Sequence, residues 1–104
     1  MAQMNMQKMM KEARKMQEEV ARAQEEVVLL EAEGTAGGGA VKAVASGNGR
    51  IKQLDISPDA IDPDDAEMLE DLVLSAVNEA LGNVSELAQM RMDAATGGFN
   101  LPGF

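Results

Sequence analysis

A heptad pattern in the first third of the chain constrains the fold most. Apolar residues recur at alternating spacings of three and four, at Met6, Met9, Ala13, Met16, Val20, Ala23, Val27 and Leu30. We call these eight residues the seam, because a repeat of about 3.5 residues is typical of a left-handed coiled coil. No Gly or Pro precedes Gly34, which predicts one helix over residues 3–32, about 45 Å long at ~1.5 Å per residue. The remainder of the 104 residues cannot cover such a rod, so the seam requires a second long helix or a second chain.

Two short strands are predicted after the glycine-rich stretch that begins at Gly34. Residues 40–46 and 50–56 flank the pair Asn48-Gly49, and Asn-Gly is a strong signal for a two-residue hairpin turn. Residues 30–36 are a candidate edge strand ahead of this hairpin, although they overlap the end of the predicted helix.

The hairpin turn and the apolar pattern predict the same strand register. Directly opposed residues should be Val41 with Ile56, Lys42 with Asp55 and Ala43 with Leu54. The apolar members of these pairs share one side of the sheet, and the Lys–Asp pair lies on the other. In this register Ile51 falls on the polar side.

A second long helix is predicted to begin near Pro63. Asp62 is the expected N-cap, Pro63 the first helical residue, and acidic residues follow in the first turn. We expect the helix to reach Ala95, with Gly82-Asn83 as a candidate break. Its broad apolar face comprises Leu69, Leu72, Val73, Ala76, Val77, Ala80, Val84, Leu87 and Ala88.

The order is therefore helix, short meander, helix, in one domain over residues 1–96 followed by a flexible C-terminal tail over residues 97–104. The chain has no Cys and no His, which excludes the usual zinc sites and the Ser-His and Cys-His nucleophiles. No apolar run approaches the length of a transmembrane helix, and the N-terminus does not resemble a signal peptide. We expect a cytoplasmic protein that is not an enzyme and holds no metal or cofactor.

The charge is distributed unevenly. The formal net charge is −9, but eight of the nine basic residues lie before residue 53, and residues 55–104 hold eleven acidic residues. Four of the cations crowd one part of the first helix, at Lys8, Lys11, Arg14 and Lys15. Heptad positions place all four away from the seam. Two interpretations fit them: a solvated helix face on which Glu12 pairs locally, or a cluster that neutralises DNA phosphates.

Segments spread along the chain also resemble a known family, the YbaB/EbfC nucleoid-associated proteins of bacteria. The resemblance is carried, in order, by residues 9–18 (MMKEARKMQE), 37–42 (GGGAVK), 55–58 (DISP), 67–73 (EMLEDLV) and 100–103 (NLPG). It implies an α+β fold with a three-stranded antiparallel sheet between two long helices, in the order α-β-β-β-α. It further implies an intertwined homodimer, no enzymatic activity, and binding of double-stranded DNA by the protruding helices.

Under this resemblance the expected role is a nucleoid-associated protein that binds double-stranded DNA with little sequence preference. Neither a membrane nor a small-molecule substrate is expected as a partner. The candidate DNA-binding residues are Lys8, Lys11, Arg14, Lys15 and Arg91, with Arg50 and Lys52 of the hairpin as the alternative site. The competing hypothesis is an acidic adaptor that binds another protein and has no direct affinity for DNA.

Overall fold

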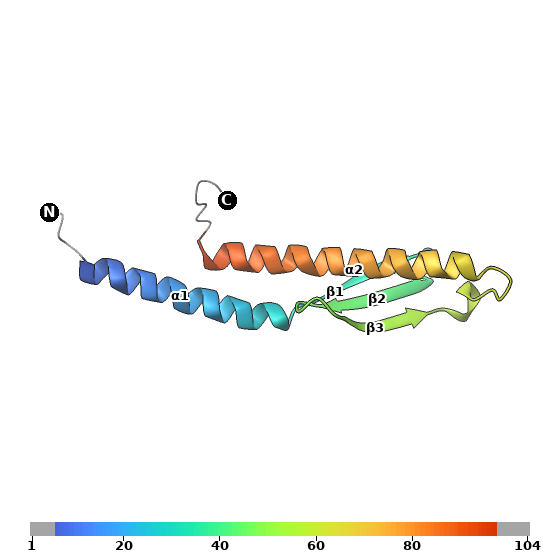
Figure 1. Cartoon of the computed structure of the whole chain (residues 1–104), viewed down its shortest axis with the longest axis horizontal. Coiled ribbons are helices and arrows are strands. Elements are labelled where there is room, and N and C mark those ends of the chain that lie inside the picture. Colours follow the sequence, from blue (N-terminus) through green and yellow to red (C-terminus); the bar gives the residue numbers. More distant parts are fainter. Residues whose placement is uncertain (1–5, 98–104) are drawn as a thin grey trace.

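The computed structural model describes residues 6–97, which form two helices and a three-stranded sheet (Figure 1). The elements are α1 (Met6–Val28), β1 (Glu31–Ala36), β2 (Val41–Ser46), β3 (Ile51–Ile56), the short 3-10 helix η1 (Pro58–Ala60) and α2 (Ala66–Ala95). The α+β class and the order α-β-β-β-α are thus confirmed. The molecule is a rod with extents of 76 × 25 × 16 Å. Of the expected C-terminal tail, residues 98–104 lie outside the described residues.

Helix α1 ends at Val28, so the expectation of a helix to residue 32 is wrong and Leu30, the last seam residue, is not helical. The candidate edge strand is confirmed instead, as β1. Every residue from Glu31 to Ala36 faces a partner in β2. Hydrogen bonds of the antiparallel ladder therefore satisfy the backbone groups that a longer helix would have paired internally.

The strands pair antiparallel in the order β1-β2-β3. The predicted hairpin register is confirmed for the pairs Val41–Ile56, Lys42–Asp55 and Ala43–Leu54. A β-bulge at Val44 and Ala45 then shifts the register, so that Ile51 pairs with Ala45. Ala45 is fully buried in the core with residues of α2. The predicted register therefore does not extend to Ile51, which is 36% exposed.

Helix α2 packs on one face of the sheet, mainly on β1 and β2. The residues buried between them are small: Val41, Ala43, Ala45, Ala76, Ala80 and Val84. Small side chains let the helix approach the sheet closely, and the approach is closest at Gly34 in β1. A Cβ atom there would lie 2.3 Å from the Ala76 carbonyl oxygen and 2.3 Å from the Ala80 nitrogen, so only glycine fits.

The start of α2 differs from the prediction. Asp65, not Asp62, is the N-cap: its carboxylate accepts a hydrogen bond from the Met68 N–H at 3.2 Å. The Asp62 carboxylate instead accepts from the Asp64 N–H at 2.9 Å, in a turn ahead of the helix. Residues 62–65 form this turn instead of the first turn of the helix, so α2 begins only at Ala66.

Helix α2 runs without interruption to Ala95, the predicted end, so the candidate break at Gly82-Asn83 is wrong. Gly82 is exposed and costs the helix some stability, but Asn83 is tied to the sheet. Its side-chain amide donates to the Glu33 carbonyl of β1 at 2.9 Å. Packing of the helix along the sheet outweighs the low local helix propensity.

The N-terminal part of α1 projects past the end of α2 (Figure 1). Ala94 and Ala95, at the end of α2, line a depression together with Glu19 and Arg22 of α1. Residues 6–18 therefore extend beyond the second helix, and we call them the arm.

Coverage of the seam changes along α1. Ala23 is buried, and Val20 and Val27 are half-buried where α1 and α2 contact each other. In the arm, by contrast, Met6 and Met9 are 72% and 68% exposed. The predicted second long helix thus covers only the C-terminal half of the seam.

Candidate nucleic-acid interface

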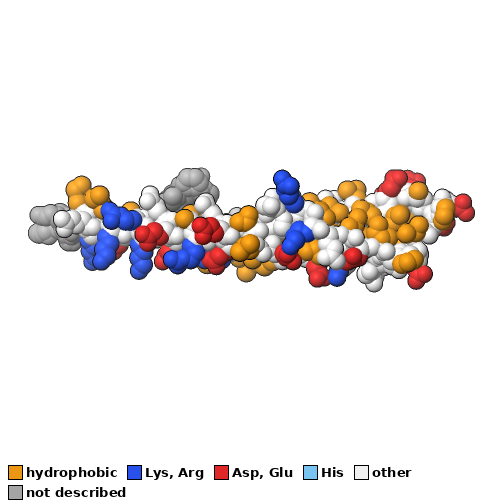
Figure 2. All heavy atoms as spheres, turned by 90° about the horizontal axis from the view of Figure 1, so that it is seen from below, with side chains coloured by type: hydrophobic (Ala, Val, Ile, Leu, Met, Phe, Trp, Pro, Cys, Tyr) orange, Lys and Arg blue, Asp and Glu red, His pale blue; other side chains and the backbone are white. Residues whose placement is uncertain are grey.

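Four cations lie close together on the arm. They are Lys8, Lys11, Arg14 and Lys15, and all four are exposed. They span about 10 Å along the helix at ~1.5 Å per residue. Figure 2 shows basic side chains gathered over the α1 end of the molecule. The structure therefore places the four predicted residues in one exposed cluster, here called the arm cluster.

No member of the arm cluster forms an ion pair within residues 6–97. The two ion pairs in this part of the chain join Lys52 to Glu31 and Arg91 to Glu26. Glu12, the local partner expected for a merely solvated helix face, is not among the paired acids. The cluster therefore presents positive charges that are not neutralised by neighbouring acids and can contact a polyanion.

Arg91, the fifth predicted residue, lies in a different environment. Its guanidinium donates to both carboxylate oxygens of Glu26, with Nη2–Oε2 at 2.5 Å and Nε–Oε1 at 3.4 Å. Hydrogen bonding from Arg91 lowers the pKa of the Glu26 carboxyl, and the same hydrogen bond raises the pKa of Arg91. The structure thus does not bring Arg91 into the arm cluster: its charge joins α2 to α1 across the packed half of the seam.

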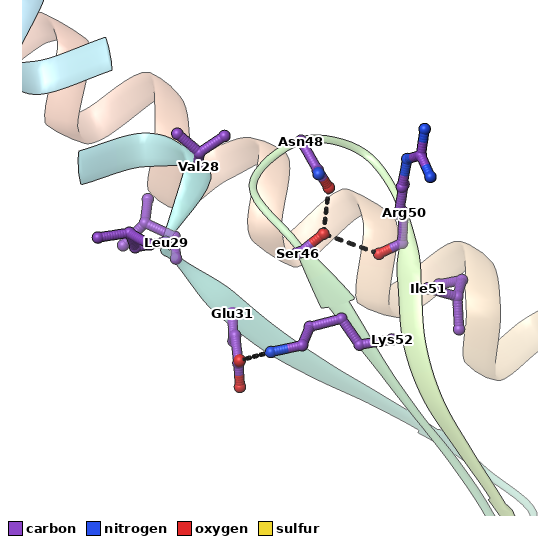
Figure 3. Close-up of a pocket in the computed structure, with 9 residues that line it drawn as sticks. Val28, Leu29, Glu31, Ser46, Asn48, Arg50, Ile51 and Lys52 are labelled. Carbon is purple, nitrogen blue, oxygen red and sulfur yellow. Dashed lines mark hydrogen bonds and ion pairs between the residues drawn. The ribbon is translucent and has the colours of Figure 1, made fainter. Parts of the chain in front are cut away.

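The hairpin cations Arg50 and Lys52 differ from each other (Figure 3). Lys52 forms an ion pair with Glu31 of β1. Arg50 is exposed, has no acidic partner within residues 6–97, and points away from the Glu31–Lys52 pair. Sequence spacing does not distinguish these two cations, because the partner that neutralises Lys52 comes from another strand.

A continuous apolar surface remains uncovered beside the sheet. Leu69, Val73, Leu74 and Val77 of α2 line an open groove of about 510 Å³ together with Glu70. Strand β3 is exposed along most of its length, including Leu54 at 42%. Figure 2 shows apolar side chains collected over this end of the molecule. Such a large exposed patch is typical of a protein–protein interface.

Helix α1 carries a second uncovered groove of about 400 Å³. Its lining residues are Ala13, Met16, Gln17, Val20, Ala21 and Gln24.

In residues 6–97 no group of His, Cys, Asp and Glu is arranged to hold a metal ion. Neither helix in that range combines the length and apolarity that crossing a bilayer requires.

Comparison with known proteins agrees with this architecture. The crystal structure of an uncharacterized protein of Helicobacter pylori superposes with a TM-score of 0.65 at 22% identity, covering 84% of this chain and 91% of that one. A nucleoid-associated protein of Caldanaerobacter subterraneus subsp. tengcongensis is 50% identical over 95% of this chain and 89% of its own. One of Desulforamulus reducens is 52% identical over 95% and 94%. The family model described as YbaB/EbfC DNA-binding matches residues 1–99. A protein with this fold, these relatives and this match over nearly its whole length belongs to the YbaB/EbfC DNA-binding family.

Proposed function

We propose that this protein is a nucleoid-associated protein that binds double-stranded DNA as a homodimer, through the arm cluster and with little sequence preference. The observation that carries the proposal is the arm itself. It projects beyond α2 and bears four exposed cations without an ion-pair partner in residues 6–97. Each cation that contacts a phosphate releases a counterion, which supplies affinity that does not depend on base sequence.

The homodimer is supported by the apolar surface that the single chain leaves open. The groove on α2 and the exposed strand β3 adjoin one hydrophobic core, and the arm leaves half the seam uncovered. A second copy offers the same apolar surface, so a symmetric pairing buries both at once. Two arms in one particle also raise the effective concentration of each arm at the DNA.

The expected lack of sequence preference follows from the composition of the arm cluster. Three of its four cations are Lys, whose ammonium group contacts phosphate as a point charge. Contacts to phosphates fix the position of a protein on the duplex but carry no base sequence. A nucleoid location is the expected consequence of binding DNA in this way.

A charge-matched pair of double variants tests the proposal. Lys11→Gln/Lys15→Gln removes two charges from the arm, and Lys42→Gln/Lys52→Gln removes two from the sheet. Fluorescence anisotropy on a 30-bp duplex, about 100 Å long at ~3.4 Å per base pair, gives affinity at several salt concentrations. We expect the arm variant to bind roughly 10-fold or more weakly at ~0.1 M salt and the sheet variant to resemble wild type.

Two outcomes contradict the proposal. If wild type shows no salt-dependent binding to any duplex, the adaptor hypothesis replaces DNA binding. If the two double variants weaken binding equally, net charge alone governs affinity and the arm is not the site. Circular dichroism checks that both variants keep the helical content of wild type.

A further inference from the structure

We propose that Arg50, at the hairpin turn, is a second phosphate-contacting site, engaged by a duplex that follows α1 from the arm cluster to the base of the helix. The inference rests on the proposed function, because it extends the same DNA surface. It assigns a role to a cation that the arm cluster does not include. Of the two hairpin cations, it assigns this role to Arg50 alone.

The first observation is that the turn is held firmly against the base of α1. The Gly47 N–H donates to the Leu30 carbonyl at 2.9 Å. A Cβ atom on Gly47 would lie 1.6 Å from the Val27 carbonyl oxygen, so the turn packs directly on the last turn of the helix. The hairpin therefore has a defined position relative to α1.

The second observation is that the backbone of Arg50 is fixed, whereas its side chain has no acidic partner within residues 6–97. Its carbonyl accepts from the Ser46 N–H at 2.7 Å and from the Ser46 hydroxyl at 3.2 Å. The Asn48 side chain is also turned inward and contacts the Ser46 hydroxyl (Figure 3). The guanidinium alone extends outward from this turn. The backbone of Arg50 is fixed and its planar guanidinium extends outward, an arrangement that suits recognition of phosphate.

The third observation is the distance between the two sites. From Lys8 to Val28 the helix rises about 30 Å at ~1.5 Å per residue, and the packed turn adds the reach of the Arg50 side chain. One turn of B-DNA is about 34–36 Å. The separation of the two sites along α1 therefore matches the spacing of phosphates one turn apart on a duplex.

Lys52 provides a matched control, because it lies on the same hairpin but is already neutralised by Glu31. On a 30-bp duplex, Arg50→Gln should flatten the slope of log K against log salt by about 0.9 for each phosphate that is no longer neutralised, equivalent to ~8-fold in affinity at ~0.1 M salt. Lys52→Gln changes net charge equally and should leave the slope unchanged. Arg50→Lys should restore most of the slope, because it retains the charge.

Duplex length provides a second test. An 8-bp hairpin duplex is about 27 Å long at ~3.4 Å per base pair, too short to connect the two sites. Arg50→Gln should weaken binding to the 30-bp duplex but not to the 8-bp duplex. The inference is overturned if wild type binds DNA and Arg50→Gln leaves the slope intact, if Lys52→Gln has the same effect, or if the loss is equal on both duplexes. Absence of binding by wild type overturns the proposed function itself.

Discussion

The sheet end and the arm of this molecule both carry apolar side chains, but these are buried at the sheet and exposed on the arm. At the sheet, Val41, Ala43 and Ala76 are fully buried, and α2 fits closely enough to exclude a methyl group at Gly34. On the arm, Met6 and Met9 remain mostly exposed although they continue the same seam. The comparison teaches that the chain buries the core at its sheet by itself and leaves the apolar residues of the arm exposed.

The two regions also divide the charge. The exposed cations of the arm, which form no ion pair within residues 6–97, lie at one end of a 76 Å rod. The acids of residues 55–71 lie near the start of α2 at the other end. At physiological salt the Debye length is about 8 Å, so the distant acids are largely screened at the arm. An acidic protein can therefore bind a polyanion at a local basic site.

The largest effect should come from breaking the completed core. Gly34→Leu forces a side chain into the backbone of α2, and we expect a loss of more than about 3 kcal/mol in the free energy of unfolding. Gly82→Ala is the control: a Cβ there meets nothing within 4 Å, and helix propensity predicts a gain of up to ~1 kcal/mol. Thermal unfolding followed by circular dichroism measures both. A Gly34 variant that unfolds like wild type would show that the close approach of helix and sheet is not required.

Breaking the exposed apolar groove on α2 should act on assembly instead. Leu74 is 60% exposed in the single chain, so Leu74→Asp should cost the monomer little. In a homodimer it would bury an unpaired carboxylate, and we expect dissociation at micromolar concentration. Ser75→Asp introduces the same charge at the neighbouring exposed position and should leave the dimer intact. Sedimentation velocity compares the two, and equal behaviour would place the dimer interface away from this groove.

The division of charge predicts a limited response to salt. Binding of wild type to several unrelated duplexes should weaken with salt by a slope that corresponds to only a few phosphates, and should differ little between sequences. A homodimer would carry twice the net charge of −9, and its repulsion of DNA should keep the affinity modest. Nanomolar binding to one duplex alone at physiological salt would reveal a base-reading surface that the arm does not explain.

The smallest effect should come from the contact that joins the two regions. Arg91→Gln removes the ion pair with Glu26 and should modestly loosen the packing of α1 against α2, measured as faster hydrogen exchange in residues 19–28. The pKa of Glu26 is lowered in the folded protein from its ordinary value of 4.5. The stability that the Glu26–Arg91 ion pair contributes is therefore present above pH 4.5 and is lost as the pH falls through the lowered pKa. The difference between wild type and Arg91→Gln should therefore vanish in acid. A difference that persists there would mean that Arg91 acts through packing rather than charge.

Much of this architecture could be predicted because its signals are local. The heptad spacing of the seam predicts a long helix with an apolar face, and most of that helix is present. Asn48-Gly49 and the alternating pattern around it predict the hairpin and three of its pairs. The exposure of the arm cluster likewise follows from heptad position. In each case the residues that determine the feature are neighbours in sequence.

Tertiary structure decided the points at which two local signals competed or a distant partner was needed. Residues 29–33 suit a helix by composition, but strand pairing with β2 and the fit of Gly34 under α2 placed residues 31–33 in a strand. The bulge at Val44 and Ala45 and the N-cap at Asp65 were likewise seen only in the structure. Arg91 and Lys52 resemble free cations in the sequence, and each is neutralised by an acid that only the folded chain brings near. Local sequence sets which structures are accessible, whereas contacts between distant residues select one of them, because burial and hydrogen bonding are satisfied only when the elements pack together.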